Sequence, residues 1–416
     1  MSMYNFISFG FFLSLSFVLL MPLLFSIGLG GIHSLTVMNG YFIFDSLSFY
    51  LIILVFFLGV YGMLSTRVEL SGVSILFLVL SLVFTGLCFC VNHAILFWCL
   101  YELSILPLLL LIFVDSPYSE RFIAGWYFAV YLLVTSLPLI LLLLYLSFLN
   151  GSLFFSDWEF CQGHLVVYLT LSFVFFTKVP LCPFHTWLPI VHAEATSIVS
   201  IFLSGYIMKL GLLGVYRCAP HIFSGGFMVY LFICCVFSIF FMITAANELD
   251  GKRWLAFLSL SHILIPFLSF YVSSWGTINL SFLYCLGHGL SAGLVFGFLW
   301  LFYNITHTRN WLLLKQGVCG WFPTLLITVG LLSLCSFPPT IQFFCEVYLL
   351  SSSMQSYLYL VFWGAYLFFG GLVPLVLCGH ILVRLEAFEV PNYYLHCFAF
   401  LFLYLSLWCF LGVFVL

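Results

Sequence analysis

Stretches of about 20 consecutive apolar residues recur along the whole length of this chain, with almost no charge inside them. Of the 416 residues, 65% are hydrophobic and only 6% are charged, whereas a soluble globular domain has about 25% charged residues. Each stretch is long enough to cross a hydrocarbon core about 30 Å thick. Because no water is available there to satisfy the backbone, the sequence predicts an all-α polytopic membrane protein.

Polar, charged and Gly/Pro clusters divide the chain into about thirteen predicted spans and no soluble domain. We expect these spans at approximately 4–30, 44–64, 72–91, 93–114, 120–149, 164–191, 195–218, 222–246, 252–271, 276–303, 319–352, 355–383 and 395–415. The first one lacks a basic start and a small-residue cleavage site, so we interpret it as a span and not as a signal peptide. Residues 1–416 are therefore expected to form a single transmembrane domain.

Positive charges between the predicted spans lie almost entirely in the loops that follow even-numbered spans. These charges are Arg67, Arg121, Lys252, Arg253, Arg309, Lys315 and Arg384, whereas Arg217 lies on the opposite side. The positive-inside rule then predicts that these loops and the N-terminus are inside and that the C-terminus is outside. The net charge of −3 is spread thinly and indicates no nucleic-acid partner.

The fifteen cysteines do not form a recognisable metal or cluster motif. The chain has no C-x-x-C, and its nearest approaches are Cys88-Phe-Cys90 and the pair Cys234-Cys235. Neither spacing suits zinc or an iron–sulfur cluster, so we interpret the cysteines as small apolar residues that fill space in the protein interior. The chain also lacks a dinucleotide fingerprint and a flavin motif, and we expect it to bind no cofactor or metal.

Four ionisable residues are predicted deep within spans: Glu102, Lys178, Lys209 and Glu346. A charge at the centre of a bilayer costs about 2.5–3.5 kcal/mol on insertion scales. Two bases and two acids allow structural pairing between helices, but Leu or Ala would pack there without that cost. We therefore favour a functional role for these four charges.

Prolines interrupt two of the spans beside these charges. Two prolines follow Lys178 within five residues, and residues 338–339 are both proline and precede Glu346. Each proline removes a helical hydrogen bond, and irregular backbone at that depth is tolerated where it lines a polar cavity or is buried in protein. The breaks fall in the fourth span of two five-span blocks, 72–218 and 222–384. This pattern predicts two inverted repeats, each with a broken helix, and ion sites near the midplane.

Six segments around the predicted breaks and buried charges stand out as motifs: KVPLCPFHTWLPIVHAEA at 178–195, YELSILP at 101–107, IMKLGLLGVYR at 207–217, PPTIQFFCE at 338–346, KRWLAFLSLSHI at 252–263 and LGHGLSAGLVF at 286–296. These segments resemble signatures of the antiporter-like subunits of respiratory complex I. The resemblance extends over about residues 40–385, and the segments occur in the order and at about the spacing expected for the family. The chain departs from the family at Thr196, where proline is usual, and in an N-terminus one span shorter than in many relatives.

The resemblance implies a proton relay through the buried charges. Lys178 would be the proton-exchanging base, Glu102 its ion-pair partner, Lys209 the central lysine, His262 and His288 polar links, and Glu346 the exchange site toward the outer face. A carboxylate near a buried lysine favours its protonated form, and withdrawal of that carboxylate lets burial favour the neutral form.

Four other polar residues near the predicted breaks and span ends have less certain roles. For His185 and His192, two interpretations remain open: they bind a ligand or transfer protons, or they cap the backbone groups freed by the helix break. We expect Glu194 at the membrane surface and Asp45 at the interface, where the second span begins.

The function implied by the resemblance is proton translocation as a subunit of a redox-driven pump in the mitochondrial inner membrane. NADH, FMN, iron–sulfur clusters and ubiquinone would be used in other subunits. The expected partners are the other membrane-arm subunits, especially the antiporter-like chains 2 and 5 and the lateral helix of chain 5, together with lipids such as cardiolipin.

Three alternatives compete with this interpretation. The chain could be a subunit of a free-standing cation/proton antiporter, a different antiporter-like chain of complex I, or a structural scaffold. The largest antiporter-like chain ends in a long lateral helix, which we do not expect after Leu416. The four buried charges argue against a scaffold.

Overall fold

The computed structural model describes residues 36–66, 70–159, 162–223, 227–272, 278–313, 321–354, 357–383 and 402–411. Within these ranges, nine helical segments are long and apolar enough to cross a membrane, and two shorter apolar helices accompany them. The prediction of an all-helical membrane protein is confirmed. The span predicted at 4–30 and most of the one at 395–415 lie outside the described residues, so the total of thirteen remains a prediction.

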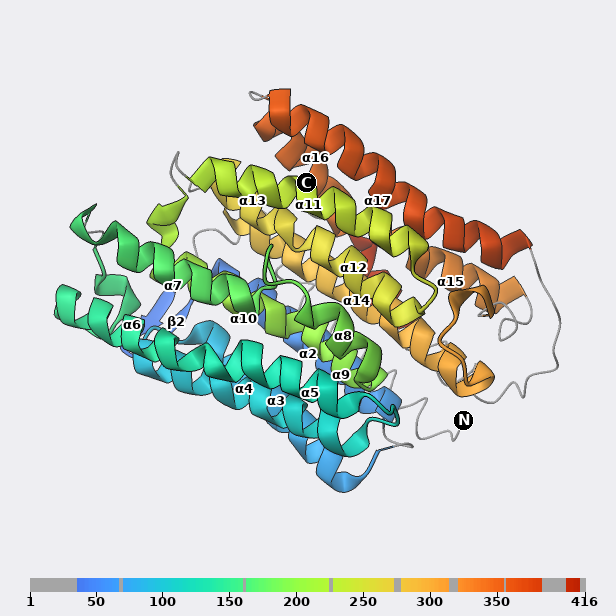
Figure 1. Cartoon of the computed structure of the whole chain (residues 1–416), viewed down its shortest axis with the longest axis horizontal. Helices are drawn as coiled ribbons and strands as arrows, with labels where there is room; N and C mark the ends of the chain where they lie inside the picture. Colours follow the sequence, from blue (N-terminus) through green and yellow to red (C-terminus); the bar gives the residue numbers. More distant parts are fainter. Residues whose placement is uncertain are drawn as a thin grey trace.

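The first part of the described chain is a row of neighbouring helices that begins with a short hairpin (Figure 1). The hairpin consists of β1 (Val37–Asn39) and β2 (Phe42–Phe44), and the helices are α2 (Ser46–Thr66), α3 (Gly72–Cys90), α4 (Ala94–Asp115), α5 (Arg121–Ala129) and α6 (Ser136–Asn150). The side chains of Ser71 and His93 accept backbone N–H groups at the starts of α3 and α4. A π-helical segment, η2 (Val130–Val134), joins α5 to α6, so the predicted span 120–149 is continuous but not uniformly α-helical.

The sixth predicted span is broken where the prolines require it. After the 3₁₀ turns η3 (Phe155–Asp157) and η4 (Gln162–His164), α7 (Leu165–Lys178) ends at the lysine, and α8 (Trp187–Glu194) follows after irregular backbone. The next span combines α9 (Ser197–Phe202), the π-helical η5 (Leu203–Ile207) and α10 (Met208–Cys218), and is followed by the turn η6 (Pro220–Ile222). The predicted break after Lys178 is confirmed.

The second part of the chain repeats this alternation of long and interrupted helices. Its helices are α11 (Phe227–Asn247), α12 (Gly251–His262), α13 (Leu264–Val272), α14 (Asn279–Thr306), α15 (Trp321–Leu334), α16 (Ile341–Ser353) and α17 (Tyr357–Val383), and residues 402–409 are also helical. The break between α15 and α16 contains residues 338–339, as predicted. A further interruption between α12 and α13 follows His262 directly and was not predicted.

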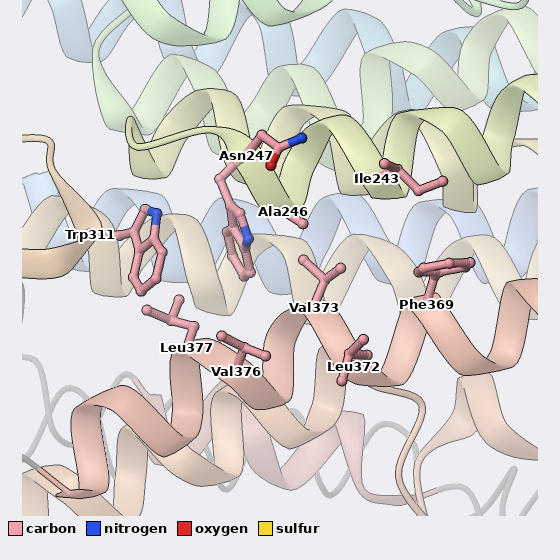
Figure 2. A pocket seen from close by; sticks show the side chains of 10 residues that line it. Ile243, Ala246, Asn247, Trp311, Phe369, Leu372, Val373, Val376 and Leu377 are labelled. Carbon is pink, nitrogen blue, oxygen red and sulfur yellow. The ribbon is translucent and has the colours of Figure 1, made fainter.

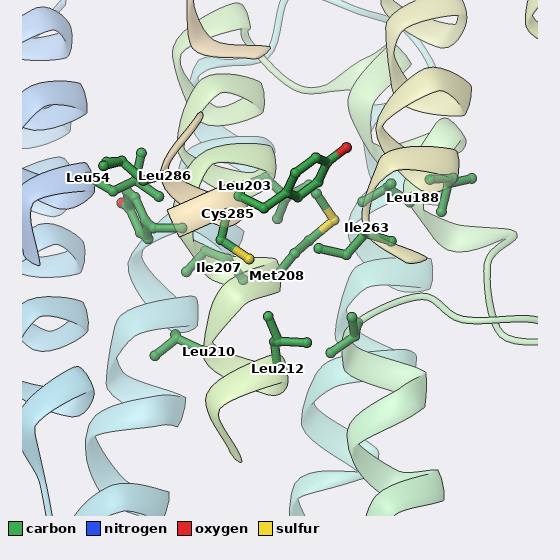
Figure 3. Close-up of a cluster of buried hydrophobic side chains, with 14 of the residues drawn as sticks. Leu54, Leu188, Leu203, Ile207, Met208, Leu210, Leu212, Ile263, Cys285 and Leu286 are labelled. Carbon is green, nitrogen blue, oxygen red and sulfur yellow. The ribbon is translucent and has the colours of Figure 1, made fainter. Parts of the chain in front are cut away.

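Helix α14 lies at the centre of the molecule, and all of residues 281–302 are buried. Helices α2 and η5 approach α14 closely at Gly289, which has no side chain. A Cβ atom at this position would lie 2.6 Å from Leu54 Cδ1 and 3.1 Å from the Gly205 carbonyl oxygen. Apolar side chains from α2, η5, α10 and α14 fill the surrounding space, as Figure 3 shows for Leu203, Met208 and Cys285. Outer helices instead expose apolar residues such as Leu141 and Val361, as expected of a surface in lipid.

Candidate functional site

Lys178 and Glu102 form a buried ion pair beside the break in the first interrupted helix. The Lys178 Nζ lies 3.0 Å from the Glu102 Oε1, and the two side chains are 0% and 11% exposed. Nζ also donates to the Leu132 carbonyl at 3.0 Å and lies 4.4 Å from the centroid of the Tyr101 ring. The second carboxylate oxygen of Glu102 has no hydrogen-bond partner among the described residues.

The carbonyl groups freed at the end of α7 are satisfied locally. Val179 and Leu181 donate backbone N–H groups to Phe175 and Phe176, and the Trp187 indole donates to the Thr177 carbonyl at 3.0 Å. Trp187, which sequence reasoning did not single out, therefore caps the first half of the broken helix with a residue from the second half.

The two histidines near this break differ, because the His185 ring forms a hydrogen bond with the Pro183 backbone and the His192 ring forms none with the described residues. His185 packs against Phe241 with ring centroids 4.6 Å apart, and its Nδ1 has no partner in the described part of the chain. His192 is fully buried and stacks on Phe296, and neither of its ring nitrogens has a described hydrogen-bond partner. Backbone capping is thus not observed for the His192 side chain within the described residues.

Lys209 is fully buried at the start of α10 and donates from its Nζ to the Ser204 carbonyl. Among the described residues, no carboxylate lies within ion-pairing distance of this Nζ. Ser204 lies in the π-helical η5, and Leu132, which accepts from Lys178, lies in the π-helical η2. Both lysines therefore bind a carbonyl in a π-helical segment, a feature that recurs at functional sites.

His262 and His288 lie side by side beyond Lys209. Their ring centroids are 5.2 Å apart, and the ring of Tyr366 lies 6.0 Å from that of His262. Lys209 interacts electrostatically with both histidines. The Nδ1 of His262 and both ring nitrogens of His288 have no hydrogen-bond partner in the described ranges.

Glu346 lies buried near the second break and accepts hydrogen bonds from two hydroxyl groups. Tyr284 donates to its Oε1 at 3.2 Å and Ser336 at 2.9 Å, and the hydroxyls of Tyr284 and Tyr366 are 3.2 Å apart. Sequence reasoning missed these tyrosines. Tyr284 had a usable signal, because it precedes His288 by four positions and so lies on the same face of α14.

Four of the six predicted residues lie well inside candidate spans. These are Glu102, Lys209, His262 and His288, in the spans at 94–115, 197–218, 251–272 and 279–306. The broken helix lies against α10, because a Cβ on Gly211 would be 3.7 Å from the Lys178 Cβ. We call the set of Glu102, Lys178, Lys209, His262, His288 and Glu346 the buried row.

A second polar cluster lies at the end of the bundle where α8 ends and α12 begins. Arg309 pairs with Glu194 at 3.2 Å and with Asp250 at 3.4 Å, while the Lys252 Nζ donates to the Ala195 carbonyl at 2.8 Å and the Tyr118 hydroxyl at 3.2 Å. Lys252 and Glu194 are only 2% and 4% exposed. The expectation that Glu194 lies at the membrane surface stays a prediction, and its carboxylate is buried against Arg309.

The electrostatics of this cluster keep its arginine charged and its tyrosine neutral. Burial lowers the pKa of Arg309, but attraction to Asp250 and Glu194 outweighs that effect, and the pKa is raised. Burial is also the main cause of the raised pKa of the Tyr118 phenol. Tyr118 therefore contributes a neutral hydroxyl and an aromatic face, over which the Arg309 guanidinium lies at 4.4 Å.

Asp45 and Arg217 form a third charged contact, at the opposite end of the bundle. The Arg217 Nη2 lies 3.2 Å from the Asp45 Oδ2, and the Arg217 and Asp45 side chains are 7% and 17% exposed. The same nitrogen donates to Ser48 at 3.1 Å. Asp45 is therefore partly buried and paired at the start of α2, away from the buried row.

Two features bear on a metal or cofactor site: the described cysteines and one apolar cavity. No group of three or more His, Cys, Asp or Glu residues suited to a metal was found among the described residues, and Cys88, Cys90, Cys234 and Cys235 are free. A cavity of about 170 Å³ lies between α11 and α17 (Figure 2). It is lined by Ile243, Ala246, Asn247, Trp254, Trp311, Phe369, Leu372, Val373, Val376 and Leu377, none of which is charged.

Comparisons with known proteins agree with this architecture. The family model described as NADH:quinone oxidoreductase/Mrp antiporter, TM, matches residues 91–371. NADH-ubiquinone oxidoreductase chain 4 of Rhipicephalus sanguineus is 28% identical over 342 residues, which are 80% of this chain and 77% of that relative. A chain of respiratory complex I from Thermus thermophilus is similar in structure, with a TM-score of 0.78, 21% identity and coverage of 96% of this chain and 89% of that one. A chain of the Mrp complex from Dietzia sp. DQ12-45-1b matches with a TM-score of 0.75, 15% identity and coverage of 93% and 76%.

Proposed function

This chain belongs to the NADH:quinone oxidoreductase/Mrp antiporter transmembrane family, and from that premise we propose that it translocates protons as a membrane-arm subunit of respiratory complex I, of the chain 4 type. NADH oxidation and ubiquinone reduction are assigned to other subunits. The proposed neighbours of this chain in the membrane arm are the other antiporter-like chains. The proposed location is the mitochondrial inner membrane. The chain 4 relatives support the choice of complex I within the family.

The observation that supports proton transfer is the buried row itself. The row consists of an ion pair at a helix break, a buried lysine without a carboxylate partner among the described residues, two adjacent histidines and a hydroxyl-bound glutamate. Intramembrane ionisable groups are costly and are typical of proton relays. A structural role would not require histidines whose ring nitrogens lack hydrogen-bond partners among the described residues.

In the proposed mechanism, the distance between Glu102 and Lys178 controls the first step. While the two groups are in contact, the carboxylate favours protonated Lys178. Separation leaves a buried ammonium bound only to the Leu132 carbonyl and the face of Tyr101, so the lysine releases its proton toward Lys209. Lys209 then passes a proton to the His262–His288 pair, and the tyrosine hydroxyls connect that pair to Glu346.

A free-standing cation/proton antiporter is the second candidate function. It is favoured by the likeness in fold to a chain of the Mrp complex. The two candidates differ in their partners, because a complex I subunit copurifies with NADH dehydrogenase activity and an antiporter subunit does not. Copurification after mild solubilisation of the membrane decides between them.

The proposed function is tested by replacing each lysine of the row with arginine. Arginine keeps the positive charge but does not release its proton at any accessible pH. We expect Lys178→Arg and Lys209→Arg to preserve assembly and to abolish proton pumping, measured as protons translocated per NADH oxidised in reconstituted vesicles. Native pumping ratios in both variants would show that the lysines are structural charges and would refute the relay.

A further inference from the structure

The last three carbonyl groups of the α8 segment are bound by side chains from three different elements. Arg309 Nη1 donates to Ala193 at 2.6 Å, Ser116 Oγ donates to Glu194 at 2.5 Å, and Lys252 Nζ donates to Ala195 at 2.8 Å. Ser116 ends α4, Lys252 lies in the first turn of α12, and Arg309 follows α14. We call Ser116, Lys252 and Arg309 the α8 clamp.

Charges of both signs surround the clamp. Arg309 pairs with Glu194 and Asp250, and Lys252 interacts with these two carboxylates and with Arg309. Positive groups at a helix C-terminus interact favourably with its partial negative charge, and the carbonyls there have no partners within the helix. The clamp thus satisfies the carbonyl groups of a buried helix end.

Helix α8 is short, has irregular backbone on both sides and packs against α5 and α12. It spans only Trp187–Glu194, follows the break after Lys178, and is separated from α9 by Ala195 and Thr196. Its other end is tied to α7 by the hydrogen bond from Trp187 to Thr177. A displacement of α8 therefore acts directly on the backbone beside Lys178.

Helix α12 connects the clamp to the buried row. Lys252 lies in its first turn and His262 is its last residue. We propose that Lys252, Arg309 and Ser116 are positioning residues that join α8 to α12, so that movement of α12 near His262 changes the Glu102–Lys178 contact. This inference rests on the proposed function, and in it Lys252 holds α8 without exchanging protons.

The inference is tested in the assembled complex with Lys252→Met and Lys252→Arg. Two quantities are measured: hydrogen–deuterium exchange of the amides in 187–195, and protons translocated per NADH oxidised. We expect Lys252→Met to raise the exchange of these amides about tenfold, because α8 can then open locally without unfolding of the rest of the protein. We also expect this variant to lower the number of protons translocated per NADH oxidised. Lys252→Arg retains the charge and the donors and should keep both quantities native. Arg253→Met, which changes the adjacent half-buried charge, is the matched control and should leave exchange in 187–195 unchanged.

Each other result overturns the inference. Native exchange in Lys252→Met shows that Lys252 does not hold α8, and raised exchange with native pumping shows that the position of α8 does not matter. Blocked pumping in Lys252→Arg identifies Lys252 as a proton carrier. If Lys252→Met does not assemble, Ser116→Ala decides by the same two measurements, since it removes one neutral donor and no charge. The proposed function is tested separately. If Lys252→Met leaves exchange and pumping native while Lys178→Arg and Lys209→Arg abolish pumping, the inference about the clamp fails and the proposed function stands.

Discussion

At the scale of single residues, Lys178 is held by three groups that respond differently to a small movement. Glu102 provides charge, Leu132 a carbonyl and Tyr101 an aromatic face. Only the carboxylate distinguishes strongly between the charged and neutral amine, because charge–charge attraction exceeds dipolar attraction in a medium of low dielectric constant. The protonation of Lys178 therefore depends mainly on its distance from one oxygen atom.

Replacement of Glu102 by glutamine should keep the shape of this contact and remove its charge. We expect Glu102→Gln to assemble normally and to lower coupled turnover about tenfold, which corresponds to about 1.4 kcal/mol in the barrier. Turnover is measured as NADH:ubiquinone activity of the reconstituted complex, with NADH oxidation by an artificial acceptor as the control for the redox part. Native turnover in the assembled variant would remove Glu102 from the mechanism.

The sequence was sufficient to find the charges inside the spans but not the contacts of the charges at the span ends. Glu102 and Lys178 were expected to pair, and they do so across 76 positions. Lys252 was assigned to a loop and Glu194 to the membrane surface because each lies at the end of an apolar stretch, where charge is usual. Their burial depends on Arg309, more than fifty positions from either, and no local pattern reports such a contact.

At the scale of helices, proline marked the two breaks, but no residue pattern marked the π-helical segments. Pro180 and Pro183 lack backbone donors, so the end of α7 could be predicted. Segments η2 and η5 consist of ordinary apolar and small residues, VYLLV and LSGYI. Their geometry is set by packing and by the lysines that bind their carbonyls, and these are tertiary contacts.

The central position of α14 leads to a prediction about glycine. A methyl group at Gly289 would meet the Gly205 backbone, which cannot rotate away, whereas one at Gly364 on exposed α17 would meet nothing within 4 Å. We expect Gly289→Ala to destabilise the assembled complex by about 1–3 kcal/mol and Gly364→Ala to have no such effect. Thermal inactivation of the two variants is compared, and equal midpoints would show that α14 can move aside.

At the scale of the whole molecule, the basic loops and the hairpin lie at opposite ends of the bundle. Arg121 and Lys252 begin α5 and α12 at one end, while β1 and β2 lie at the other (Figure 1). The positive-inside rule assigns the basic end to the inside, which is the matrix in the proposed location, and this orientation remains a prediction. The N-terminal span and the inverted relation of 72–218 to 222–384 also remain predictions.

Orientation can be measured with two protease sites. One is inserted after Ser119, in an exposed turn at the basic end, and the other at Gly40, in the tip of the hairpin. In intact mitoplasts we expect cleavage at Gly40 and protection at Ser119, with cleavage at both after detergent treatment. Cleavage at Ser119 alone would reverse the orientation, and cleavage at both in sealed mitoplasts would contradict the placement of these loops on opposite sides.

The position of the buried row inside the spans has an electrical consequence. A membrane potential acts along the bilayer normal, and moving one charge through all of it involves about 2.3 kcal/mol per 100 mV. Lys209 and His288 both lie inside their candidate spans, away from either end, so a proton that passes between them crosses only a small part of that voltage. The work against the potential therefore falls on the steps that connect the two ends of the row to the aqueous phases. A high potential should slow proton entry and release while leaving transfer along the row nearly unchanged.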